Sequence, residues 1–375
     1  MLAKFFTLKN ILLIAVNALL IIAFIVCLSV SSSIRTSLRS QQAASAWTGQ
    51  SGERFAQISA FFPGSVSFDE SSIFQLRDSI DRALVGASLE SEPGRTLYTD
   101  AWSAEGYASV LSMRSPTPAR VKVIGVGGDF FLFHPFFLRD GSYLSPDDVM
   151  KDRVVIDEEL AWRLFGAVRV AGFEIMIDNV PFIVAGVIAR ESDFASEKAY
   201  TYEASLFMSF EALNEMMDGE ARINCYEIVL ADPITGFAYS TLGSGLSGSD
   251  IVIVENSSRF SFSNTFSAIR SFGERSIQTN AIAFPYWENA ARYAEDWLAL
   301  ILALTFIFAL FPLICGIVYA VKLIRFGIRQ LIKLIKKLIE KKDKKDYEKY
   351  LLKHGEALEE DYDLEDIIRE VTGND

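Results

Sequence analysis

Histidines and acidic side chains are the groups of this chain that could do chemistry, and few of them have the spacing that a reaction needs. The two histidines, His134 and His354, have no cysteine or acidic residues around them at the spacing of metal ligands. His134 lies in an aromatic segment and lacks the oriented acid partner that base catalysis needs, so we expect its ring to pack beside aromatic core residues. We predict no catalytic residue, no cofactor, no metal site and no enzymatic activity. An envelope hydrolase is the least favoured class.

Two further patterns resemble binding sites but fit them poorly. Acidic residues gather between Asp147 and Glu159, yet their spacing does not match a calcium loop, so we interpret them as a solvated acidic face. The glycine-rich run at 125–128 lacks the lysine of a phosphate-binding loop of the G-x-x-x-x-G-K-[ST] type. We expect a tight turn there, because glycine tolerates positive φ. No ATPase motif is present in this sequence.

The aromatic segment around His134, residues 130–137, contains more apolar side chains than one face of a strand can bury. Packing between two lobes of a folded domain is the interpretation that we favour. The alternative is an exposed contact for a partner or an apolar ligand, as apolar patches often provide. The candidate contact residues are Phe133, Phe136 and Phe137.

Two long apolar runs bracket the chain, residues 11–30 and 297–321. At about 1.5 Å of rise per residue, each is long enough to cross a hydrocarbon core of about 30 Å. Lysines precede the first run within residues 1–10, and a lysine- and arginine-rich segment follows the second, so both termini are expected in the cytoplasm. A cleaved signal peptide is the alternative for the first run, although its apolar region is usually only about 7–15 residues long.

The segment between the runs is acidic, with 21 Lys and Arg against 35 Asp and Glu over residues 32–296, and we expect it outside the cytoplasm. Nucleic acid is not an expected partner. Residues 31–50 contain no proline and only Gly49 as glycine, so they are expected to continue the first helix as a stalk. Beyond them, hydrophobic periodicity predicts a mixture of strands and helices. The predicted strands are 55–62, 121–126, 154–156, 205–208, 226–230 and 251–255; the predicted helices are 69–89, 161–165, 210–217 and 234–242; and 173–188 forms a hairpin that turns at Asp178-Asn179. We expect Ser71 or Ser72 as the N-cap of the first of these helices and Gly166 as the C-cap of the second. The Gly- and Ser-rich stretch 239–250 is expected to be a loop.

Residues 123–187 also carry a family resemblance through the order and spacing of particular positions. These are Gly125-Val126, Phe130-Phe131, Leu138, Gly141-Ser142-Tyr143, Asp147, Val154 to Glu158, Ala161, Leu164-Phe165-Gly166, Gly172, Ile175, Ile177, Phe182 and Val184 to Val187. The segment resembles the extracytoplasmic core domain of the MacB and FtsX-type ABC transporter permeases, and it likewise follows an N-terminal span. That family has three spans after the outer domain, whereas this chain has one apolar run there.

The resemblance implies an α+β membrane protein in which two transmembrane helices flank a two-lobed extracytoplasmic domain. Residues 51–120 and 191–260 would form a porter-like lobe, with residues 121–190 inserted as a β-rich lobe. Residues 261–296 would connect the domain to the second span.

The implied function is that of a non-catalytic membrane subunit of an ABC-type export or mechanotransmission complex. Its partners would be a separate ATPase and another permease subunit or a second copy, in a bacterial plasma membrane. The alternative is a two-span envelope adaptor or sensor that recruits cytoplasmic proteins.

The cytoplasmic end has two parts. Residues 322–346 predict an amphipathic basic helix that contacts anionic lipid of the inner leaflet, or alternatively docks its apolar stripe on another subunit. The candidate membrane-surface residues are Arg325, Arg329, Lys333, Lys336 and Lys337. Residues 347–375 are an acidic tail, and its part from Glu356 to Asp375 is expected to be disordered, with a short partner-binding helix through Leu358, Leu364, Ile367 and Ile368 as the alternative.

Overall fold

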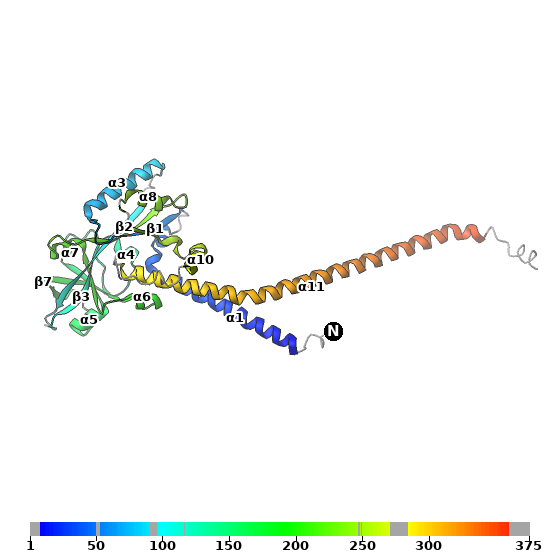
Figure 1. The fold of residues 1–375 in the computed structure, drawn as a ribbon, viewed down its shortest axis with the longest axis horizontal. Coiled ribbons are helices and arrows are strands. Elements are labelled where there is room, and N and C mark those ends of the chain that lie inside the picture. The colour runs from blue at the N-terminus through cyan, green and yellow to red at the C-terminus, as the bar shows by residue number, and fades with distance from the viewer. Residues whose placement is uncertain are drawn as a thin grey trace, which may run out of the picture. The chain divides into compact units, whose positions relative to one another are not determined.

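The computed structural model describes residues 8–49, 53–89, 96–115, 117–246, 248, 250–270 and 284–359. The chain divides into two compact units, one of residues Ala23–Phe306 and one that combines Met1–Ile22 with Ile307–Asp375. The first unit contains a large β-sheet with helices on it (Figure 1).

The helices are α1 (Leu8–Ser37), α2 (Ala43–Thr48), α3 (Glu70–Gly86), α4 (Phe130–Phe133), α5 (Glu158–Phe165), α6 (Phe194–Ala199), α7 (Phe210–Met216), α8 (Phe237–Gly245), α9 (Asn256–Arg259), α10 (Phe262–Arg270) and α11 (Tyr286–Glu359), with a 3-10 helix η2 at Arg39–Gln41. The strands are β1 (Phe55–Phe61), β2 (Tyr98–Leu111), β3 (Ala119–Gly128), β4 (Phe137–Gly141), β5 (Arg153–Asp157), β6 (Glu174–Ile177), β7 (Val180–Ala189), β8 (Ser205–Ser209), β9 (Ile223–Ala231) and β10 (Val252–Glu255).

One sheet joins all of these strands. Its order is β10-β1-β9-β2-β3-β8-β5-β7-β4, and β6 pairs with both β2 and β7. The pairs β3–β8 and β5–β7 are parallel, and the other pairs are antiparallel. The strands of the predicted porter-like lobe (β1, β2, β8, β9, β10) and those of the predicted inserted lobe (β3 to β7) are therefore hydrogen-bonded into one structure.

Two hydrophobic cores lie on the two faces of the sheet. Side chains alternate between faces along a strand, so in β1 Ile58 joins the core under α3, α5, α7 and α8, while Phe61 joins the core with α2, α4, α6 and the start of α11. On the second face, β1 and β9 carry the polar side chains of Gln57, Ser59 and Glu227, all buried. The second core therefore contains buried polar groups that need hydrogen-bond partners.

Several local predictions are confirmed by capping and turn geometry. Asp157 accepts the backbone N–H of Leu160 at 2.8 Å as the N-cap of α5, and Gly166 ends that helix with φ +67°. Asp178 and Asn179 have φ values of 45° and 69°, the positive values that a two-residue hairpin turn of type I′ requires.

Other local predictions are wrong. The N-cap of α3 is Asp69, whose carboxylate accepts the N–H of Ser72 at 2.9 Å, and is neither of the serines that follow it. The Gly- and Ser-rich stretch 239–250, expected as a loop, is helical to Gly245 as part of α8. The structure also contains β2, a strand of 14 residues that the sequence patterns did not predict.

The helical stalk predicted for residues 31–50 is interrupted. α1 ends at Ser37, Leu38 has φ −80° and ψ 78°, and η2 and α2 follow as separate short helices. The Gln42 side chain donates to the Arg35 carbonyl at 2.9 Å and so satisfies an end carbonyl of α1. Leu38 and Ala43 are buried in the second core, and this packing outweighs the good helix propensity of the segment.

Two helices are long and apolar enough to cross a membrane, α1 over Leu8–Ser37 and α11 over Tyr286–Leu352. α11 begins directly after Pro285, well before the apolar run at 297, because Trp287 and Ala290 on its first turns pack in the second core. The predicted connector, 261–296, thus contains α10 and the start of α11. α11 continues to Glu359, so the described part of the predicted tail is helical rather than disordered; residues 360–375 lie outside the described residues.

Candidate functional site

A buried histidine–carboxylate pair lies at the centre of the second core. His134 follows α4, and its Nε2 lies 2.5 Å from Oε2 of Glu227 on β9. The imidazole packs against Phe130 and Trp287, each with 4.4 Å between ring centroids. The expected packing among aromatic rings is confirmed, whereas the expectation of no acid partner is wrong. Both side chains are only 2% exposed, so the pair is enclosed by the core and not open to a substrate.

Hydrogen bonds extend from this pair to Asn256, and a separate set on the same strand binds the segment that follows α1. Ser59 donates to Glu227 at 3.1 Å and accepts from the Asn256 side-chain amide at 2.6 Å. On the same strand, the Gln57 amide donates to the Ser40 carbonyl at 2.7 Å, and its oxygen accepts the N–H of Ala43 at 2.9 Å. These bonds hold η2 and α2 to β1.

A second buried cluster joins α9 to the start of α11. Both terminal nitrogens of Arg259 donate to the Glu288 carboxylate, at 2.6 and 2.9 Å, and its Nε donates to Glu295 at 2.7 Å. Glu288 also accepts from Arg292 at 2.7 Å. Burial by itself would lower the pKa of the Arg259 guanidinium, but the two carboxylates outweigh burial and raise that pKa. The guanidinium is therefore a permanent cation. We call Arg259, Glu288, Glu295 and Arg292 the arginine joint.

The predicted contact residues of the aromatic segment separate into two groups. Phe133 is fully buried and Phe136 is 7% exposed, both in the second core, which agrees with the interpretation as core packing. Phe137, the first residue of β4, is 59% exposed, and the Arg139 guanidinium lies 5.1 Å from its ring centroid. Phe137 is thus the member of the predicted set whose side chain an external molecule can reach.

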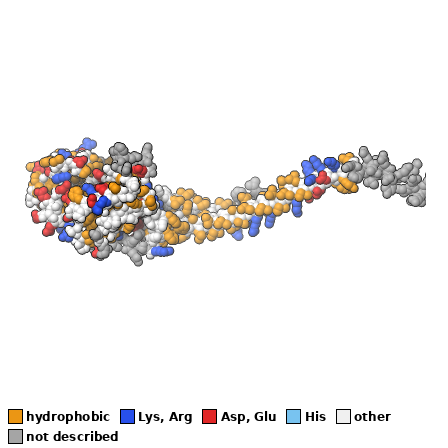
Figure 2. All heavy atoms as spheres, turned by 90° about the horizontal axis from the view of Figure 1, so that it is seen from above, with side chains coloured by type: hydrophobic (Ala, Val, Ile, Leu, Met, Phe, Trp, Pro, Cys, Tyr) orange, Lys and Arg blue, Asp and Glu red, His pale blue; other side chains and the backbone are white. Residues whose placement is uncertain are grey.

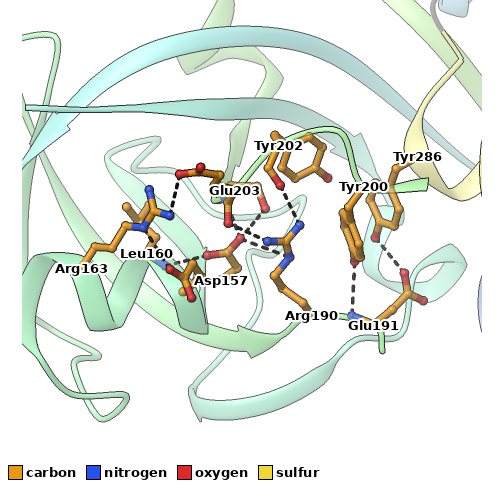
Figure 3. Close-up of polar contacts among 11 residues, drawn as sticks. Asp157, Leu160, Arg163, Arg190, Glu191, Tyr200, Tyr202, Glu203 and Tyr286 are labelled. Carbon is orange, nitrogen blue, oxygen red and sulfur yellow. Dashed lines mark hydrogen bonds and ion pairs between the residues drawn. The ribbon is translucent and has the colours of Figure 1, made fainter. Parts of the chain in front are cut away.

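A cavity of about 600 Å³ opens beside Phe137, and we call it the groove. Its walls come from the last turns of α1 with Arg39, from residues 135–139, and from residues 189–193. Arg190 on this wall donates to the carbonyls of Glu203 and Tyr202 at 2.6 and 2.9 Å and stacks on a tyrosine ring (Figure 3). The groove therefore combines a fixed cation, an exposed phenylalanine and the outer end of α1.

Glu191 is the carboxylate of this groove with a perturbed titration. Burial raises its pKa, and the opposing hydrogen bond from the Tyr286 hydroxyl, at 2.9 Å, does not cancel that effect (Figure 3). Tyr286 is the first residue of α11, so this contact ties the groove to the helix that leads to the second apolar run.

The predicted acidic face is only partly solvated. Asp157 is 1% exposed and accepts from Ser205 through N–H at 2.7 Å and hydroxyl at 3.0 Å, with Arg190 at 4.0 Å (Figure 3). Burial nevertheless raises the pKa of Asp157. This carboxylate caps α5 and fixes β8, so its role is structural. In the part of the chain that the structure describes, no group of three His, Cys, Asp or Glu side chains could hold a metal ion.

The glycine run at 125–128 is part of β3 rather than a tight turn. Only Gly128 in that run has positive φ, at 62°. A Cβ at Gly127 would lie 2.2 Å from the Trp102 ring. Glycine is needed at position 127 because the indole of Trp102, on the neighbouring strand β2, lies against the backbone there.

The basic residues expected to contact lipid lie on α11, in the second unit. Arg325, Arg329, Lys333, Lys336 and Lys337 are all exposed. Hydrophobic side chains cover the preceding length of the helix, and Lys and Arg gather farther along it (Figure 2). Their contact with lipid stays a prediction.

Comparison with known proteins assigns the chain to a family. The model of the MacB-like periplasmic core domain matches residues 11–236, and the chain belongs to this family. Macrolide export ATP-binding/permease protein MacB of Chromobacterium violaceum is 33% identical over 101 residues, which cover 24% of this chain and 16% of that protein. The match thus spans a small part of the length of this relative.

Two solved structures are similar at low sequence identity. The periplasmic region of MacB from Actinobacillus actinomycetemcomitans has a TM-score of 0.42 at 14% identity, covering 59% of this chain and 94% of that chain. The extracellular domain of the ABC-type transporter YknZ from Gram-positive bacteria has a TM-score of 0.37 at 13% identity, covering 53% and 99%. The chain is an α+β membrane protein whose two candidate membrane helices flank a MacB-like extracytoplasmic domain.

Proposed function

We propose that this chain is a non-catalytic permease component of an ABC-type export or mechanotransmission complex, acting with a separate ATPase and with another permease subunit or a second copy. The observation that carries the proposal is the family match over residues 11–236. In the proposed arrangement both termini lie in the cytoplasm and residues 32–296 lie outside.

The buried contacts give a physical route for such a function. A domain transmits motion to its membrane helices only if the junctions are stiffer than the element that moves. Here Gln57 fixes η2 and α2, which follow α1, and Arg259 fixes the start of α11 through Glu288. Gln57 lies on β1 and Arg259 lies on α9, which directly follows β10. Because β1 and β10 pair with each other, a displacement of this edge of the sheet would move both helices. The groove beside Phe137 is the proposed place for a ligand or partner.

Isolation of the complex tests the proposal. The full chain is purified from its own membranes in a mild detergent, and copurifying proteins are identified by mass spectrometry. We expect an ATP-binding subunit whose ATP hydrolysis in nanodiscs changes when Arg259→Lys loosens the arginine joint, and not when exposed Arg82 is changed to Gln. Recovery of a cytoplasmic signalling protein without an ATP-binding subunit would favour the envelope adaptor or sensor instead.

The lipid contact of the basic helix needs its own experiment. In nanodiscs, trypsin should cut after Arg325, Arg329 and Lys333 more slowly with anionic than with zwitterionic lipid, because bound headgroups cover the cleavage sites. Cleavage after Arg82 on the outer domain is the control and should not respond to lipid. Equal rates at the basic helix in both lipids would exclude the contact.

A further inference from the structure

Helix α10 carries an aromatic stripe that the described residues of the fold leave exposed. Phe262 and Phe266 are 61% and 45% exposed and stack with 6.2 Å between centroids, one helical turn apart. The neighbouring face of the helix is packed against the protein through Thr265 and Ala268, at 4% and 2% exposure. The small side chains thus face inward and the large apolar ones outward, the reverse of the arrangement that water favours.

Contacts of this stripe place it beside the second apolar run. The Phe262 ring packs edge-on against Phe306 of α11, with 6.1 Å between centroids. Phe306 is nine residues past Trp297, where the run begins, and therefore about 13.5 Å farther along the helix at 1.5 Å per residue. One leaflet contributes about 15 Å to the hydrocarbon core. If Trp297 marks the outer boundary, the Phe262 ring lies at the depth of acyl chains.

An independent aromatic cluster marks that boundary. Phe194 of α6 packs on Trp297 at 5.3 Å and on Tyr293 at 5.1 Å, and both Phe194 and Trp297 are partly exposed. Trp and Tyr gather where a membrane protein meets the headgroups. The cluster lies at the start of the apolar run, as such a belt requires.

We propose that α10 is an interfacial helix, with Phe262 and Phe266 embedded among the acyl chains of the extracytoplasmic leaflet. Lipid is the occupant because the stripe continues onto the apolar surface of α11 at Phe306, which is 50% exposed. The hydrophobic effect then stabilises the helix in that leaflet, as for other amphipathic interfacial helices. This inference rests on the proposed membrane arrangement and adds to it a third element in contact with lipid.

Cysteine accessibility tests the proposal on the full chain in nanodiscs. In a background whose three native cysteines are replaced by alanine, Phe266→Cys is compared with Ser267→Cys, its exposed polar neighbour on the same helix. A membrane-impermeant maleimide is added, and labelling is normalised to that after denaturation in SDS. We expect labelling at position 266 to be at least tenfold slower than at position 267. Equal rates would overturn the proposal.

Two further measurements separate the other outcomes. Leu310→Cys, within the apolar run, should be protected whether or not α10 touches lipid, so reaction there would refute the membrane arrangement itself. The other outcome is that the Phe266→Cys variant cross-links into dimers on oxidation and loses its protection from the maleimide when each nanodisc holds one copy. That result would show that a second copy covers the stripe and would overturn the assignment to lipid. Phe266, Ser267 and Leu310 are exposed, so these variants are expected to fold.

Discussion

Arg259 gives the sharpest test of how the sheet is joined to the start of α11. Its side chain is 3% exposed and its partner Glu288 is 1% exposed. Removal of one member of a buried ion pair usually costs about 3–5 kcal/mol, because the remaining charge stays buried without its partner. In Arg259→Met, Glu288 keeps Arg292 at 2.7 Å. We therefore expect the free energy of unfolding to fall by about 3 kcal/mol, the lower end of this range.

The assay is urea unfolding of the full chain in mild detergent, followed by tryptophan fluorescence, since Trp287 lies in the core beside the arginine joint. The control is Arg163→Met, because Arg163 pairs at the surface with Glu159 and Glu203 and surface pairs contribute at most about 1 kcal/mol. A loss for Arg259→Met no larger than that of the control would refute the reasoning.

A double substitution sharpens the same test. Arg259→Met with Glu288→Gln removes the charge that the first change leaves behind, so the two losses should not add. We expect a coupling of about 0.5–3 kcal/mol, the range for residues in one buried network. Strictly additive losses would mean that the two side chains contribute independently, despite their 2.6 Å contact.

Three further outcomes are expected. Phe133→Ala should cost about 3–5 kcal/mol of unfolding free energy by leaving a cavity, whereas Phe137→Ala should leave the urea midpoint unchanged; similar losses would contradict the division into buried and exposed. Glu191→Gln should weaken the dependence of stability on pH. Because folding raises the pKa of the Glu191 carboxyl, the free energy of unfolding of the native protein declines as pH rises from about 4.5, the ordinary value of that pKa, through its value in the folded state. Thermal melts from pH 4 to 7 should show a smaller decline in the variant. Gly127→Ala should cost about 1–3 kcal/mol in urea unfolding because its Cβ would overlap the Trp102 ring, and a neutral result would mean that the indole moves aside.

The sequence predicted those elements whose own residues determine them. Helix α5 has an N-cap and a C-terminal glycine, and the hairpin β6–β7 has Asp178-Asn179 at its turn. β2 lacked such signals: alanine, glycine and acidic residues interrupt its alternation, and its conformation is set by β9 and β3 on either side. The early start of α11 did leave a signal, because Pro285 directly precedes the first helical residue.

The buried site was harder to predict because its partners are far apart in the chain. Glu227 lies 93 residues from His134, and Gln41 and Arg259, 218 residues apart, come within 3.4 Å of each other. No spacing rule connects such positions. The sequence shows that the aromatic segment is unusual, but it does not show which of its side chains are buried. Phe133 is buried and Phe137 is exposed because the second core lies on the Phe133 side of the segment.

The pairing of β1 sets the order of events during synthesis. Among the described residues this strand pairs only with β9 and β10, and its nearest strand partner in the chain, Cys225, comes 164 residues after Phe61 (225 − 61). At about 5–20 residues per second, the ribosome needs roughly 10–30 s to reach that partner. Throughout that interval β1, whose seven residues are all buried in the folded protein, has no strand partner. We expect a nascent chain halted before residue 225 to depend on other proteins for its solubility.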